Sequence, residues 1–146
     1  YQIIHLCGKG NIDKLYNIRS GYVQFEYAGK ELRDMFALSS LVISRAGANA
    51  ICELLALHKP NILIPLSAAA SRGDQILNAR SFEKQGYSYV IEEENLTKET
   101  LDAAIKKVMT EKETYISNMK SSQQLDSIHT ILKLIEEASE KKKKKA

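Results

Sequence analysis

Residues 44–54 carry side-chain types that suit the binding of a nucleotide diphosphate. They contain a turn of small residues around Gly47, after which the spacing of apolar residues is typical of an amphipathic helix. The first amides of a helix attract anions, and Gly47, Ala48 and Asn49 are small enough to let a phosphate approach. Glu53 lies about 9 Å further along such a helix, where its carboxylate suits two ribose hydroxyls. The alternative is an ordinary strand-to-helix turn with a surface glutamate.

The rest of the chain alternates short apolar strands with amphipathic helices. Predicted strands cover residues 1–6, 22–27, 41–44, 61–65 and 87–91, and predicted helices cover residues 11–19, 30–38, 47–58, 74–85, 97–109 and, with breaks near residues 118 and 121, 111–140. This alternation predicts an α/β fold with a doubly wound, Rossmann-like parallel sheet. Ligands of such sheets bind outside the carboxyl ends of the strands. Three polar loops are expected at that edge, at residues 7–11, 44–49 and 66–75.

Single side chains indicate where some of these helices begin and which side they bury. Asn11 and Thr97 are the expected N-caps of their helices, because both residue types accept hydrogen bonds from free amides. In the helix over residues 74–85, the apolar spacing places Leu77 and Phe82 on the buried side.

Length and composition indicate one folded domain. The chain has 146 residues, 44% of them hydrophobic, and no apolar run approaches the ~20 residues that span a bilayer. The net charge of +3 depends on five lysines at residues 141–145; without them, the chain has 16 basic and 18 acidic residues and therefore a net charge of −2. The predicted domain therefore covers residues 1–140, followed by a disordered lysine-rich tail at 141–146, for which contact with an anionic membrane is the alternative. No nucleic-acid partner is expected, because the chain without the lysine run is not basic and shows no basic face. No metal site or other cofactor is expected, because the cysteines and histidines are scattered.

Motifs within the first 110 residues resemble, in order and spacing, the MurG family of bacterial glycosyltransferases, glycosyltransferase family 28. The matching segments are residues 5–10, 44–53, 59–60, 64–65, 73–79 and 83–86. The resemblance implies a GT-B enzyme with two Rossmann-like domains, which transfers N-acetylglucosamine from UDP-N-acetylglucosamine to undecaprenyl-diphospho-muramoylpentapeptide in peptidoglycan synthesis. This chain is similar to most of the C-terminal, donor-binding domain.

The resemblance also implies roles for individual residues. Glu53 is expected to hold the ribose hydroxyls, Asp74 and Gln75 the sugar hydroxyls, and the backbone near Ala28 to face the uracil. The family often has Ser or Thr in its first glycine loop, where this chain has Cys7, so a backbone role or a weak thiol contact is expected there. The full set of expected donor-binding residues is Cys7, Gly8, Ala28, Gly47, Ala48, Asn49, Glu53, Asp74, Gln75 and Asn78.

Two of these residues have structural alternatives. Asp74 suits the N-cap of its helix, and Asn78 suits packing against a turn. Neither alternative needs a ligand.

Two parts of the family pattern do not occur in this sequence. They are the N-terminal domain, which holds the lipid-linked acceptor and the catalytic base, and the glycine-rich first strand, turn and helix of the donor domain. No transfer activity is therefore expected from this chain alone. The resemblance places the full-length enzyme in the cytoplasm, in peripheral contact with the inner face of the bacterial cell membrane.

Two other interpretations remain open from the sequence. The chain could be a stand-alone UDP-N-acetylglucosamine-binding subunit that works with a separate membrane-bound partner. It could also be a plain nucleotide-binding or interaction domain, which predicts binding of UDP without preference for the attached sugar.

Overall fold

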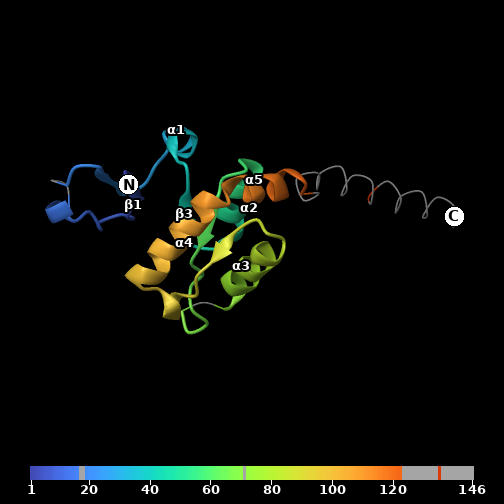
Figure 1. Cartoon of the computed structure of the whole chain (residues 1–146). Coiled ribbons are helices and arrows are strands. Elements are labelled where there is room, and N and C mark those ends of the chain that lie inside the picture. Colours follow the sequence, from blue (N-terminus) through green and yellow to red (C-terminus); the bar gives the residue numbers. More distant parts are fainter. Residues whose placement is uncertain (17–18, 71, 123–134, 136–146) are drawn as a thin grey trace, which may run out of the picture. The chain divides into compact units, whose positions relative to one another are not determined.

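The computed structural model describes residues 1–16, 19–70, 72–122 and 135. The chain divides into two compact units, unit 1 at residues 1–40 and unit 2 at residues 41–146 (Figure 1). Each unit has its own parallel sheet. The predicted α/β class with parallel strands is confirmed, while the described strands lie in two sheets. The tail predicted at residues 141–146 lies outside the described residues.

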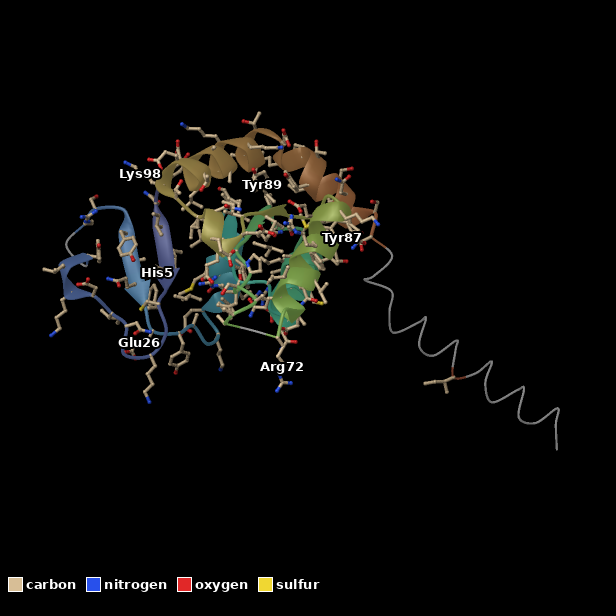
Figure 2. All side chains as sticks on the ribbon, turned by 90° about the horizontal axis from the view of Figure 1, so that it is seen from below. His5, Glu26, Arg72, Tyr87, Tyr89 and Lys98 are labelled. Atoms are coloured by element: carbon tan, nitrogen blue, oxygen red, sulfur yellow. The ribbon has the colours of Figure 1, made fainter. Side chains whose placement is uncertain are left out.

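Unit 1 contains a two-stranded sheet. Its elements are β1 (Ile3–Leu6), η1 (Lys14–Tyr16), β2 (Tyr22–Phe25) and α1 (Leu32–Leu38). β1 and β2 run parallel in a register that sets Ile3 opposite Tyr22. The Nδ1 atom of His5 lies 2.6 Å from the hydroxyl oxygen of Tyr22, which links the two strands through their side chains (Figure 2).

The N-cap predicted at Asn11 is wrong. The Nδ2 atom of Asn11 donates to the carbonyl oxygen of Cys7 at 3.0 Å, so this side chain stabilises the loop after β1. Such local bonds to the backbone are a common alternative to capping for asparagine. Asp13 acts at the start of η1 instead, where its Oδ1 accepts from the amide of Leu15 at 2.9 Å.

Unit 2 contains a three-stranded sheet with helices packed against it. Its elements are β3 (Val42–Ser44), α2 (Ala48–Ala56), β4 (Asn61–Leu63), α3 (Asp74–Lys84), β5 (Tyr89–Val90), η2 (Glu93–Asn95), α4 (Lys98–Thr110) and α5 (Lys112–Lys120). The strand order is β3-β4-β5 and both pairs are parallel, so β4 is central. The loops after β3 and β4 therefore meet at one carboxyl edge, as the sequence predicted for two of the three polar loops.

The core of unit 2 lies around β4. Its buried apolar residues are Ala46, Ile51, Leu54, Leu55, Ile62, Leu63, Ile64, Ala79, Phe82, Tyr87, Ile91, Ala104, Val108, Tyr115 and Met119. Every residue of β4 is buried, which is typical of a strand covered on both faces. The rings of Phe82 and Tyr87 meet edge to face at 5.6 Å between centroids, which joins the end of α3 to the segment before β5.

The burial predicted for Leu77 is wrong, because its side chain is 73% exposed. Asn78 on the same helix donates through Nδ2 to the carbonyl oxygen of Ala46 at 3.1 Å. This bond turns Asn78 rather than Leu77 toward the β3–α2 turn. Apolar spacing alone does not reveal such a polar contact.

The C-terminal helices follow the sequence closely where they are described. Thr97 is the N-cap of α4, and it forms a reciprocal capping box with Thr100. α5 continues through Asn118 and ends at Lys120, so the break predicted near residue 118 is wrong. The remainder of the helix predicted to residue 140 lies outside the described residues, apart from residue 135. No helix in the described part of the chain has the length and apolar character needed to cross a membrane.

Candidate functional site

The start of α2 has the geometry of an anion site. The first intrahelical bond runs from the amide of Ile51 to the carbonyl oxygen of Gly47 at 3.1 Å. The amides of Ala48, Asn49 and Ala50 precede that bond and are therefore directed away from the helix. Gly47 has φ −67°, and a Cβ atom built on it would meet nothing within 4 Å. Space for a ligand thus lies beside amides that carry partial positive charge.

One side of α2 is free to contact a ligand along its length. Ile51, Leu54 and Leu55 are buried on the side that faces the core. Asn49 and Glu53 are one turn apart on the exposed side. No ion pair to the Glu53 carboxylate occurs within the described residues, so both of its oxygens can accept hydrogen bonds.

The side chains at the start of α3 approach the same edge of the sheet. Asp74 is the first residue of α3 and is exposed, whereas Gly73 is the N-cap, so the N-cap alternative for Asp74 is wrong. The Oε1 atom of Gln75 accepts from the amide of Leu66 at 3.1 Å, in the loop after β4. Since that amide can only donate, it fixes the orientation of the Gln75 carboxamide and directs Nε2 elsewhere.

The packing alternative for Asn78 is confirmed by its bond to Ala46. The Nδ2 atom of Asn78 donates to the Ala46 carbonyl, so the Oδ1 atom of Asn78 remains available to accept a hydrogen bond from a ligand. Gln75 and Asn78 thus connect α3 to both loops of the carboxyl edge.

Sequence reasoning missed a second set of contacts at this edge. Arg45 donates through Nη1 to the carbonyl oxygen of Ile64 at 3.2 Å and through Nη2 to Oε1 of Glu93 at 2.7 Å. The other carboxylate oxygen of Glu93 accepts from the amide of Ser67 at 3.1 Å. The hydrogen bond from Arg45, and to a smaller extent the one from Ser67, holds the pKa of Glu93 below its ordinary value. Arg45 stands in a motif that the sequence reading singled out, but nothing local connects it to Glu93.

A shallow cavity of about 230 Å³ lies beside these contacts. It is lined by Pro65, Leu66, Ser67, Ala68, Ile76, Glu92, Glu93 and Glu94. Within the part of the chain that the structure describes, no group of three His, Cys, Asp or Glu side chains suits a metal ion.

Three of the predicted residues belong to unit 1. Cys7 and Gly8 follow β1, and Ala28 follows β2, so all three lie beyond the carboxyl ends of paired parallel strands. The Sγ atom of Cys7 donates to the carbonyl oxygen of Phe25 at 3.3 Å, so the thiol has a partner within its own unit. Gly8 has φ +84°, a left-handed conformation that favours glycine.

Comparison with known proteins decides the family. Residues 1–143 match the glycosyltransferase family 28 C-terminal domain. The chain belongs to this family. The family 28 chain is 64% identical over 137 residues to a protein of Lachnoclostridium phytofermentans and 60% identical over 139 residues to one of Lachnospira eligens. Both relatives are named UDP-N-acetylglucosamine–N-acetylmuramyl-(pentapeptide) pyrophosphoryl-undecaprenol N-acetylglucosamine transferase.

The match covers most of this chain but a minority of each relative. It covers 94% and 95% of this chain and 39% of the length of each relative. The crystal structure of Acinetobacter baumannii MurG has the same fold, with a TM-score of 0.73 at 20% identity over 93% of this chain and 40% of that one. The MurG resemblance and the Rossmann-like fold of a GT-B C-terminal domain are thereby confirmed.

Proposed function

We propose that this family 28 chain binds UDP-N-acetylglucosamine as the donor half of an N-acetylglucosaminyltransferase of peptidoglycan synthesis. The observation that carries the proposal is the exposed side of α2, where free amides, an open glycine and an unpaired carboxylate follow one another. The names of the relatives supply the identity of the nucleotide sugar. The complete reaction needs the parts of the enzyme that this chain does not span.

In this proposal, α2 binds the uridine diphosphate. The amides of Ala48 and Asn49 donate to the diphosphate, and Gly47 leaves room for its close approach. Glu53, about one turn beyond Asn49 along the helix, accepts hydrogen bonds from both ribose hydroxyls. Cys7, Gly8 and Ala28 stay candidates for further donor contacts on family resemblance alone, with Ala28 assigned to the uracil.

The start of α3 binds the sugar. Asp74 is an exposed acceptor, while Gln75 offers a donor because its oxygen is already bonded to Leu66. Asn78 offers its Oδ1 atom as a further acceptor. Adjacent donor and acceptor groups suit discrimination between sugar epimers, since a polar group left unpaired costs about 1–3 kcal/mol.

The reaction is an inverting displacement. The acceptor hydroxyl attacks the anomeric carbon of N-acetylglucosamine, the bond from that carbon to the UDP oxygen breaks, and a base outside this chain takes the hydroxyl proton. The contribution of this chain is electrostatic: the amides at the start of α2 stabilise the negative charge that develops on the departing diphosphate.

The proposed acceptor is the undecaprenyl-linked muramoylpentapeptide, so the complete enzyme works at a membrane. We place it in the cytoplasm, at the inner face of the bacterial cell membrane, with peripheral contact made by another part of the enzyme. The names of the relatives, which include the undecaprenol-linked acceptor, support this placement.

Calorimetric titration of the chain with UDP-N-acetylglucosamine, UDP-glucose and ADP-glucose tests the donor assignment. We expect selective binding of the first ligand, and a loss of about tenfold or more in affinity for Glu53→Gln, which keeps the size but removes the charged acceptor. Glu99→Gln is the matched control, because Glu99 is an exposed glutamate in the first turn of α4. Equal affinities for wild type and Glu53→Gln would remove Glu53 from the site.

A second variant separates an anion site from an ordinary turn. Gly47 has a φ of −67°, which alanine adopts freely, and the position of its Cβ atom is open. Gly47→Ala should therefore cost at most about 1 kcal/mol of stability, through the poorer N-cap. A phosphate against the amides of α2 would meet the new methyl group. We expect a clear loss of UDP affinity with circular dichroism unchanged; retained affinity would exclude the diphosphate from this position.

A further inference from the structure

The loop at residues 64–67, directly after β4, is held by side chains from three other segments. Arg45 comes from the β3–α2 turn and bonds to the carbonyl oxygen of Ile64. Glu93 comes from η2 and accepts from the amide of Ser67. Gln75 comes from α3 and accepts from Leu66 between them. The backbone of this loop is therefore positioned from both ends and from its middle.

The ion pair between Arg45 and Glu93 closes this arrangement. Nη2 of Arg45 and Oε1 of Glu93 form the ion pair, while Nη1 of Arg45 and Oε2 of Glu93 bond to the loop backbone. The bonds therefore form a continuous chain from the Ile64 carbonyl oxygen to the Ser67 amide. A carboxylate is needed in the middle, because it accepts at both oxygens. A guanidinium is needed beside it, because it donates from two nitrogens in a fixed plane.

We propose that Arg45 and Glu93 are positioning residues that set the 64–67 loop, and through it the Gln75 carboxamide, for the sugar of the donor. The inference rests on the proposed function, and it adds two residues whose assigned bonds are to the loop and to each other. The pair acts on the sugar end of the site, whereas Glu53 and the start of α2 act on the uridine diphosphate. Loss of the pair should therefore weaken the sugar-dependent part of binding and leave UDP binding in place.

The neighbouring residue Glu92 provides a matched control. Glu92 pairs with Arg80 on α3, and its side chain is 40% exposed, against 33% for Glu93. Both glutamates line the same cavity and both pair with an arginine. In the contacts described, the carboxylate of Glu92 bonds to side chains only, whereas the carboxylate of Glu93 also accepts from the loop backbone.

The test compares the affinities of UDP and UDP-N-acetylglucosamine for wild type, Glu93→Gln, Arg45→Lys and Glu92→Gln. A glutamine at position 93 accepts at one atom only, and a lysine at position 45 lacks the planar pair of donors. For these two variants we expect the affinity for UDP-N-acetylglucosamine to fall about tenfold, with UDP affinity within about twofold of wild type. Glu92→Gln should leave both affinities unchanged.

Other outcomes separate this proposal from the donor assignment. Equal weakening of both ligands by Glu93→Gln, or the same effect from Glu92→Gln, would reduce the pair to a general structural role and overturn the inference. Failure of wild type to bind either ligand would overturn the donor assignment instead. Amide hydrogen exchange of Ser67 then still decides the structural half, since Glu93→Gln should speed it and Glu92→Gln should not. Unchanged exchange in Glu93→Gln would show that the Arg45–Glu93 pair does not hold the 64–67 loop, and would overturn the inference.

Discussion

Replacement of Gly86 by alanine should destabilise unit 2 by an amount that the structure determines. Gly86 lies between α3 and β5 with φ +69°, a left-handed conformation that costs an L-residue about 1 kcal/mol. A Cβ atom there would lie 2.5 Å from Nδ2 of Asn118, which donates to the carbonyl oxygen of Gly86 at 3.1 Å. The Asn118 side chain must then move away, with the loss of a hydrogen bond worth about 1 kcal/mol. The expected total for Gly86→Ala is about 2 kcal/mol.

Two further variants separate the backbone strain from the contact. Gly73→Ala introduces a methyl group at φ +83° with nothing within 4 Å of it, so it should cost the conformational part, about 1 kcal/mol, and, because Gly73 is the N-cap of α3, at most about 1 kcal/mol more. Asn118→Ala removes the hydrogen bond alone and should also cost about 1 kcal/mol. The double variant Gly86→Ala/Asn118→Ala should then cost about 2 kcal/mol rather than the sum of about 3, because the shared bond is lost only once.

Native-state hydrogen exchange measures these values within unit 2. Useful probes are the amides of Ile64 and Ile91, which bond to neighbouring strands at 2.9 Å and 3.0 Å. They report opening of the three-stranded sheet without an assumption that the two units unfold together. Strict additivity of Gly86→Ala and Asn118→Ala would refute the contact between them.

Three more predictions concern the core and the site. Gln75→Glu keeps an acceptor for the amide of Leu66 but removes the Nε2 donor, so unfolding free energy should change little while calorimetry shows a weaker preference for the sugar. Leu63→Ala, at a fully buried position of β4, should destabilise unit 2 by about 2–5 kcal/mol in the same exchange assay. The hydrogen bond from Arg45 lowers the pKa of Glu93, so the pair contributes fully to the stability of the folded state at pH values above the ordinary pKa of a glutamate. This stabilisation is lost as the pH falls through the lowered pKa. Carboxyl NMR titration should give the low midpoint in wild type and a higher one in Arg45→Lys; equal midpoints would contradict the assigned cause.

The parts of the fold that the sequence predicted are those that local pattern determines. The helical spacing of Ile51, Leu54, Leu55 and Leu57 predicts the buried side of α2; the first three are buried, but Leu57 follows the end of the helix and is 49% exposed, so its predicted burial is wrong. The continuous apolar run predicts β4 as a strand covered on both faces. The residue type of Thr97 predicts an N-cap, and the structure adds a capping-box partner, Thr100, only three residues away. Each of these features is set by residues within a few positions of one another.

The predictions that failed concern segments in which an asparagine side chain bonds to a backbone carbonyl. Leu77 is apolar, but at 3.6 residues per turn it lies on the side of α3 opposite the buried Ala79, and its neighbour Asn78 bonds to the Ala46 carbonyl 32 positions away. Asn11 is an effective capping residue type, but its partner is the carbonyl of Cys7 at the end of β1. The fold alone brings the Ala46 carbonyl to Asn78, whereas the Cys7 carbonyl lies four positions before Asn11 in the chain.

The candidate site divides along the same line. Its anion-binding half lies on one helix and its preceding turn, so strand, small residues and Glu53 could be found together in one stretch of sequence. Its other half depends on a loop whose shape is set by Arg45, Gln75 and Glu93, and the ion pair in it spans 48 positions. Family resemblance marks Gln75 as a ligand contact, but the bond from Leu66 determines which of its two polar atoms a ligand can meet. The polar atom of Gln75 that is available to the proposed sugar is therefore a property of the folded loop and not of the residue type alone.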